Sequence, residues 1–121
     1  MQPVGDKYRA HQLILNDAAH LLRKSRYWSR GRRWAFSLRK RYCIQEALFV
    51  AAHQQHPAAI TAYREIVNYL EATLGRPLEA FNNDWRTRHR DILAALDDAW
   101  IYFFAQGFDT TVSATSHPPA G

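Results

Sequence analysis

The sequence predicts an all-α fold: a compact four-helix domain in which a basic, irregular loop at residues 25–39 precedes a central apolar helix at about 40–54. Three observations lead to this fold class. Apolar residues recur every three or four positions along several stretches, which is the spacing of one face of an α-helix. Residues 42–52 are apolar around most of a helical circumference, as expected of a helix enclosed by others. Glycine and proline separate the stretches.

Length and composition restrict the class of protein. The chain has 121 residues, of which 47% are apolar and 22% charged, and this fits one globular domain. We expect that domain to cover residues 8–107, between disordered segments at 1–7 and 108–121. No apolar run approaches the ~20 residues of a membrane-spanning helix. The single cysteine excludes an internal disulfide, and no secretory leader is visible, so we expect a cytoplasmic protein without a membrane span.

The first helix is predicted at about residues 8–24. Ile14, Ala18 and Leu21 lie on one face of it at helical spacing. The two cations at its end suit the negative pole of the helix dipole. The following segment, 25–39, has no sustained period, so we expect a short hairpin or an irregular loop there.

The central helix is predicted to end near Gln54. The dipeptide His56-Pro57 follows, and proline suits the first turn of a new helix better than the end of an old one. A third helix is therefore expected at about 57–74. Its apolar stripe consists of Ile60, Tyr63, Val67, Leu70 and Leu74. Gly75 is a natural residue to end it.

The connector at 76–85 contains a polar cluster between aromatic residues. In a functional interpretation, Asn82 and Asp84 extend from a loop to hold a ligand or orient a base. In a structural interpretation, Phe81 and Trp85 hold the connector onto the core.

The last helix is predicted at about 87–106, with Asp84 or Thr87 as its N-terminal cap and Gly107 at its end. Its buried side follows helical spacing. That side consists of Ile92, Leu93, Leu96, Trp100, Phe103 and Phe104.

Positive charge is concentrated in one segment of the chain. Nine cations and no acid lie between Arg23 and Arg41. The net charge of the whole chain is only +5, so the residues outside this segment have a net charge of −4. Aromatic residues interleave with these cations: Tyr27, Trp28, Trp34 and Phe36. Arginine beside an exposed aromatic ring is the combination that binders of single-stranded nucleic acid use.

The favoured function is therefore a non-enzymatic binding or regulatory protein that engages an anionic partner through segment 23–41. Nucleic acid and an acidic protein surface are the two candidate partners. A solvated loop with inward-facing aromatic residues is the alternative for this segment. The residues predicted to bind are Arg26, Trp28, Arg30, Arg32, Arg33, Trp34, Arg39, Lys40 and Arg41.

The alternative function is a small enzyme with Cys43 as nucleophile. The opening turn of the central helix and its cationic neighbours would lower the pKa of this thiol. His89 or His53 would then serve as base, with Asn82 or Asp84 orienting it. The competing interpretation of Cys43 is a small buried residue in a helix contact.

Metal binding and self-association are weaker predictions. His53 and His56 stand three residues apart, and Glu46 could join them, but a zinc site needs three or four ligands in suitable geometry. We therefore expect no metal and no cofactor. Exposed apolar helix surface could instead make the protein a homodimer.

Five short motifs occur in this chain order: Ala18-Ala19, Trp28-x-x-Gly31, Cys43-x-x-x-Ala47-Leu48, Phe81-Asn82-Asn83-Asp84 followed by Arg86-Thr87, and Leu96-Asp97-x-Ala99. In this order they make the chain resemble an uncharacterised family of small helical proteins found mainly in actinobacteria and their phages. The chain departs from that family at Glu46, where glycine is usual. The resemblance implies a helical fold, and it implies no reaction or partner because the family has no established activity.

Overall fold

The computed structural model describes residues 8–30, 41–55 and 59–116, with side chains up to residue 107. Within these ranges the regular structure is helical, so the all-α prediction is confirmed. The elements in chain order are α1 (Arg9–Leu21), the 3-10 helix η2 (Ser25–Tyr27), α2 (Ile44–Gln55), α3 (Ala59–Leu74), α4 (Leu78–Asn83) and α5 (His89–Ser116). Among the described residues, no helix combines the length and the hydropathy that crossing a membrane requires.

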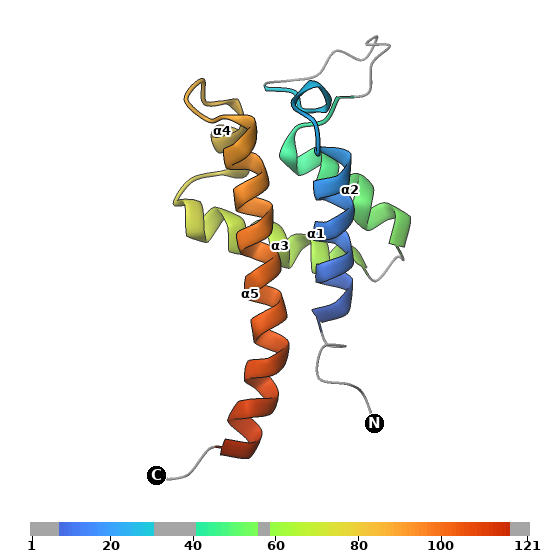
Figure 1. Ribbon diagram of the computed structural model, residues 1–121, viewed down its shortest axis with the longest axis vertical. Coiled ribbons are helices and arrows are strands. Elements are labelled where there is room, and N and C mark those ends of the chain that lie inside the picture. Colours follow the sequence, from blue (N-terminus) through green and yellow to red (C-terminus); the bar gives the residue numbers. More distant parts are fainter. Residues whose placement is uncertain (1–7, 31–40, 56–58, 117–121) are drawn as a thin grey trace.

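Several elements meet at one end of the molecule. Figure 1 shows the end of α1, the start of α2, α4 and the start of α5 all at the upper end, whereas the later part of α5 extends away from the other helices. Segments far apart in sequence are therefore neighbours at this end, where η2 also lies.

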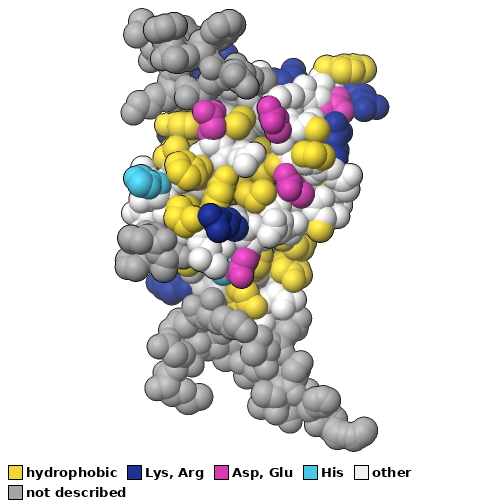
Figure 2. Space-filling view, turned by 180° about the vertical axis from the view of Figure 1, so that it is seen from behind, with side chains coloured by type: hydrophobic (Ala, Val, Ile, Leu, Met, Phe, Trp, Pro, Cys, Tyr) yellow, Lys and Arg dark blue, Asp and Glu magenta, His cyan; other side chains and the backbone are white. Residues whose placement is uncertain are grey.

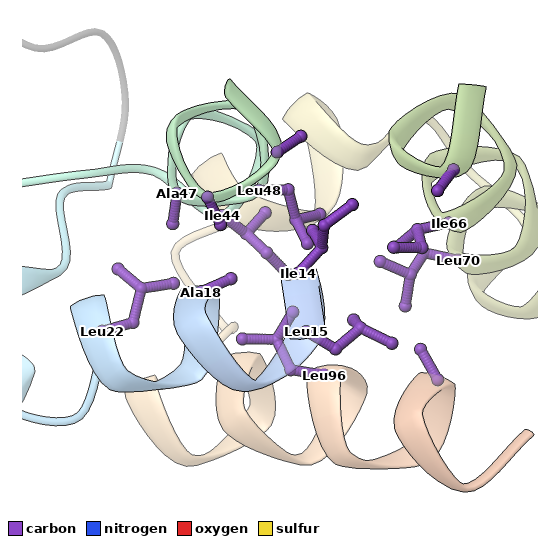
Figure 3. Packing of buried hydrophobic residues seen from close by; sticks show 14 of the residues in the cluster. Ile14, Leu15, Ala18, Leu22, Ile44, Ala47, Leu48, Ile66, Leu70 and Leu96 are labelled. Atoms are coloured by element: carbon purple, nitrogen blue, oxygen red, sulfur yellow. The ribbon is translucent and has the colours of Figure 1, made fainter. Parts of the chain in front are cut away.

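Helix α1 lies between α2 and α5. It packs against both of them and against α3, and Figure 3 shows it between the other two. Ile14, Ala18 and Leu22 on α1 and just after it are fully buried. Helix α2 packs in turn against α1, α3 and α4, so the predicted apolar helix also lies among other helices.

Helix α2 contributes the buried residues that its apolar run predicts. Ala47 and Leu48 are both 0% exposed, and the small side chains of Ala51 and Ala52 are buried with them. The spacing of packed helices depends on the side chains at their contact, so alanines favour close packing. Phe49 is the exception: it is 48% exposed, and its ring contacts Tyr63 of α3 with ring centres 5.6 Å apart.

The first helix ends three residues earlier than predicted. The backbone N–H of Leu22 donates to Ala18 O, and the Arg23 guanidinium donates to His20 O at 2.7 Å. These bonds satisfy carbonyl groups at the helix end, which lack partners further along the helix. The chain then makes the single turn of η2.

A parallel bridge joins Trp28 to Tyr42. Ser29 N–H donates to Tyr42 O at 2.9 Å, and Tyr42 N–H donates to Tyr27 O at 2.8 Å. A hairpin would pair its arms antiparallel, so these residues do not form one.

Helix α4 forms inside the segment expected to be a connector. Leu78 is fully buried, and its N–H donates to the Glu71 carboxylate at 2.7 Å. Burial of this apolar residue stabilises a helix too short for its periodicity to be visible in the sequence. Gly75 ends α3 with a φ of 73°, as predicted for a glycine at that position.

The last helix starts two residues later than predicted, and its predicted end is wrong. The helix begins at His89, so Arg88 rather than Asp84 or Thr87 holds the N-cap position. The N–H of Arg88 donates to the carboxylate of Asp91 in the first turn at 2.9 Å. Gly107 does not end the helix, which continues to Ser116. A glycine inside a helix costs only about 1 kcal/mol relative to alanine, which a long helix tolerates.

Candidate functional site

Asn82 joins three segments at the end of the molecule where α1 ends and α2 and α5 begin (Figure 1). We call this end the crowded end. Its side chain is 0% exposed. Its Oδ1 accepts hydrogen bonds from the Trp28 indole Nε1–H at 2.8 Å and from Ile44 N–H at 2.9 Å. Its Nδ2 donates to Ser29 O and to Asn83 Oδ1, both at 3.0 Å. Two accepted and two donated bonds use the full capacity of an amide side chain, which leaves this one no hydrogen bond to offer a ligand.

Asp84 is held by two arginines. Its side chain is 9% exposed, and its carboxylate pairs with Arg76 at 2.9 Å and with Arg86 at 3.0 Å. The Arg86 guanidinium, the Arg86 backbone N–H and Arg76 together hold the pKa of Asp84 well below its ordinary value. The carboxylate therefore stays ionised and fixes the loop between α4 and α5.

Two contacts join this loop to the segment after α1. The Nε2–H of His89 donates to Leu22 O at 2.5 Å. The Arg30 guanidinium donates to Thr87 O and lies 4.9 Å from the centre of the Trp28 ring. Residues 22–30 and 87–89, far apart in sequence, are therefore neighbours on the surface.

The described part of the basic segment is exposed to solvent. Arg23, Lys24, Arg26 and Arg30 are all exposed, whereas Arg41 is half-buried. The guanidinium groups of Arg23 and Arg26 each lie 5.2 Å from the centre of the Tyr27 ring.

The cations around Tyr27 also affect its ionisation. A hydrogen bond from Arg26 is the main cause that lowers the pKa of this phenol, and the charges of Arg26, Lys24 and Arg23 act in the same direction. Three cations, Arg23, Lys24 and Arg26, therefore favour the ionised form of Tyr27.

Five of the predicted binding residues lie outside the described ranges, namely Arg32, Arg33, Trp34, Arg39 and Lys40. Trp28, by contrast, is half-buried, with its indole bonded to Asn82 and its ring beside Arg30. It anchors the start of the basic segment rather than offering a free ring face.

Trp85 is the aromatic residue that lies in solvent. It is 79% exposed, so the prediction that it holds the connector onto the core is wrong. Phe81 packs against the core, as predicted, and Leu78 of the same segment is part of the core. Three exposed arginines follow Trp85 at alternate positions, namely Arg86, Arg88 and Arg90. This pattern of one tryptophan followed by alternating arginines is a sequence signal that could have indicated a second part of the cationic surface.

Cys43 is the N-terminal cap of α2. Its Sγ accepts a hydrogen bond from Glu46 N–H at 3.3 Å, and its own N–H donates to the Glu46 carboxylate at 3.1 Å. This reciprocal pair is a capping box in which sulfur takes the place of a hydroxyl. It explains why α2 begins at Ile44 rather than near Lys40.

The prediction that the pKa of Cys43 is lowered is wrong. Burial raises the pKa of the thiol, and the nearby Glu46 carboxylate raises it further. These effects outweigh the backbone N–H groups, which alone would favour the thiolate.

The four predicted catalytic residues do not share one cleft. Cys43 and Asn82 line a cleft of about 440 Å³, but neither His89 nor Asp84 is among its lining residues. His53 stacks on Phe49 with ring centres 6.1 Å apart, and His56 lies outside the described residues.

The fold and the contacts at its crowded end define a small all-α domain with an exposed, arginine-rich surface. The chain belongs to the family of unknown function DUF6197, whose sequence model matches residues 9–101. No curated protein and no solved structure matches the chain. Membership of an uncharacterised family agrees with the resemblance drawn from the motifs, and two of those motifs, at Trp28 and at Asn82, are joined directly by a hydrogen bond.

Proposed function

We propose that this protein binds single-stranded nucleic acid through a basic surface at the crowded end of the molecule. We use the name basic surface for the exposed cations and two aromatic residues of the two neighbouring segments: Arg23, Lys24, Arg26, Tyr27, Arg30, Trp85, Arg86, Arg88 and Arg90. The observation that carries the proposal is an exposed tryptophan, 79% accessible, followed directly in the chain by the exposed Arg86. The loop that holds both residues is joined to the segment after α1 by the contacts of Arg30 with Thr87 and of His89 with Leu22.

The chemistry of this surface favours nucleic acid over an acidic protein. Arginine pairs well with phosphate and with carboxylate alike, so the cations alone do not discriminate between the two partners. An exposed tryptophan ring can stack on a base, and stacking contributes about 1–3 kcal/mol per base. The bases of a duplex are already stacked on one another, so a single strand is the form that Trp85 could contact.

Salt dependence of binding tests the charge contribution. If about six cations meet phosphates, the logarithm of the binding constant for single-stranded DNA or RNA should fall against log salt with a slope of about −4. The triple variant Arg23→Gln, Arg26→Gln, Arg30→Gln should make the slope shallower by about 2. Arg64→Gln, which changes an exposed arginine on α3, is the matched control and should leave the slope unchanged.

Trp85→Ala tests the stacking contribution separately. It should weaken binding of a single strand about 5- to 150-fold, which corresponds to the 1–3 kcal/mol of one stacked base, and leave the salt slope unchanged. Phe49→Ala removes another exposed aromatic ring, from the middle of α2, and should not change the affinity.

Two results would overturn the proposal. One is binding that stays flat, or is absent, across about 50–200 mM salt for both DNA and RNA. The other is equally tight binding of a glutamate polymer that Trp85→Ala does not weaken, which would make an acidic protein the partner.

The alternative of an enzyme with Cys43 as nucleophile has less support. A nucleophilic cysteine needs a lowered pKa and a base within hydrogen-bond reach. The pKa of Cys43 is raised, and the Nε2–H of His89 is bonded to Leu22 O.

A further inference from the structure

A cleft of about 440 Å³ opens between α2, α3 and α4. Its volume lies in the range of about 300–1,000 Å³ typical of small-molecule sites. Trp85 is not among its lining residues. Figure 2 shows the face opposite to that of Figure 1, where hydrophobic side chains gather with both acidic and basic side chains among them.

The inner surface of the cleft is apolar. Ile44 and Leu78 line it and are 0% exposed. Phe49 and Tyr63 line it as well, with ring centres 5.6 Å apart and planes at 80° to one another. Two rings nearly at right angles form a corner that suits a flat or branched apolar group.

The charge of the lining is negative, in contrast with the protein as a whole. Glu46 and Glu79 both line the cleft, and none of its described lining residues is a lysine, arginine or histidine. The chain has a net charge of +5, so a locally negative apolar cleft is a distinct feature of its surface. Aromatic ring faces also attract cations, which adds to the effect of the carboxylates.

We propose that this cleft binds a small organic amine, in which a protonated ammonium group is carried on an aromatic or aliphatic body. The apolar body would lie in the corner between Phe49 and Tyr63. The ammonium would lie toward Glu79, which is exposed in the first turn of α4. A carboxylate or phosphate ligand would meet unfavourable charge here, so this site and the basic surface select opposite kinds of ligand.

The test is a titration of the full chain, labelled with nitrogen-15, with three probes of similar shape. 2-Phenylethylamine is cationic, 3-phenylpropanol is neutral and 3-phenylpropionate is anionic at pH 7. The amine should cause saturable shifts in the backbone amide signals of residues 44–50 and 78–83. The anion should bind at least tenfold more weakly than the amine.

Variants separate the two parts of the site. Glu79→Gln should weaken binding of the amine about tenfold, equivalent to about 1.4 kcal/mol of lost attraction, while leaving the neutral probe unaffected. Phe49→Ala should weaken binding of both probes. Asp97→Asn removes an exposed carboxylate from α5, outside the cleft, and should change neither. All three substituted side chains are exposed, so the variants should fold, and their unfolding midpoints check this.

The proposal is overturned if the three probes bind with equal affinity, or if none gives a saturable shift at millimolar concentration. It is also overturned if a lysine-containing peptide binds the cleft far more tightly than the free amine, because the site would then be a peptide groove. None of these outcomes depends on nucleic-acid binding, so the two proposals can fail independently.

Discussion

Replacing Asn82 by alanine should destabilise the fold more than any single exposed substitution. The variant removes the acceptor of two hydrogen bonds, from Ile44 N–H and from the Trp28 indole. A buried donor left without an acceptor costs about 1–3 kcal/mol. The bond to Ile44 is buried and the bond to Trp28 is partly buried, so we expect a total loss of about 3 kcal/mol.

The assay is urea unfolding followed by circular dichroism. With a slope of about 1.5 kcal/mol per molar urea, a loss of about 3 kcal/mol lowers the unfolding midpoint by about 2 M. Asn68→Ala, at an exposed position of α3, is the matched control and should change the free energy of unfolding by less than about 0.5 kcal/mol. A loss below about 1 kcal/mol for Asn82→Ala, with an unchanged slope, would refute its assigned role.

Three further predictions concern the cap, the ion pairs and the phenol near this end of the molecule. Cys43→Ala should lower the free energy of unfolding by about 1 kcal/mol, because it removes the cap of α2. Cys43→Ser should lower it less, because serine also caps helices. Equal losses for the two variants in urea unfolding would argue against the capping box. Asp84 has a lower pKa in the folded than in the unfolded protein. Its contribution to stability is therefore present above the unfolded pKa of about 3.9 and is lost as the pH falls through the folded pKa. The urea midpoints of the native chain and Asp84→Asn should accordingly differ at pH 7, and the difference should shrink progressively as the pH falls below about 4. A difference that stays constant below that pH would contradict the ion pairing. In an ultraviolet titration, Tyr27 should ionise below the ordinary tyrosine range, and Arg26→Gln should raise its pKa; an unchanged curve would exclude their hydrogen bond.

Several elements of the fold could be read from the sequence because their causes are local. The helical spacing of apolar residues located four helices, and the buried positions of Ala47 and Leu48 follow from it. Gly75 ends α3 as predicted, because a glycine in the left-handed region needs no information from elsewhere in the chain. The family resemblance rested on short motifs in order, and the chain does belong to an uncharacterised family.

The helix boundaries and the candidate site depend on contacts between segments far apart in the chain, which no local sequence pattern shows. Helix α4 was missed because burial of Leu78, rather than periodicity, stabilises it. The pKa of Cys43 was predicted in the wrong direction, because the sequence shows its neighbouring cations but neither its burial nor its bond with Glu46.

The sequence by itself determined the helical class of this protein and the concentration of positive charge after the first helix, since both depend on which residues are close in the chain. Only the tertiary structure decided which tryptophan is exposed and which anchors the fold. Trp28 reaches Asn82 across 54 positions of sequence, whereas Trp85 lies in solvent. The physical reason is that exposure of a side chain is set by the segments packed around it, and those contacts exist only after the chain has folded.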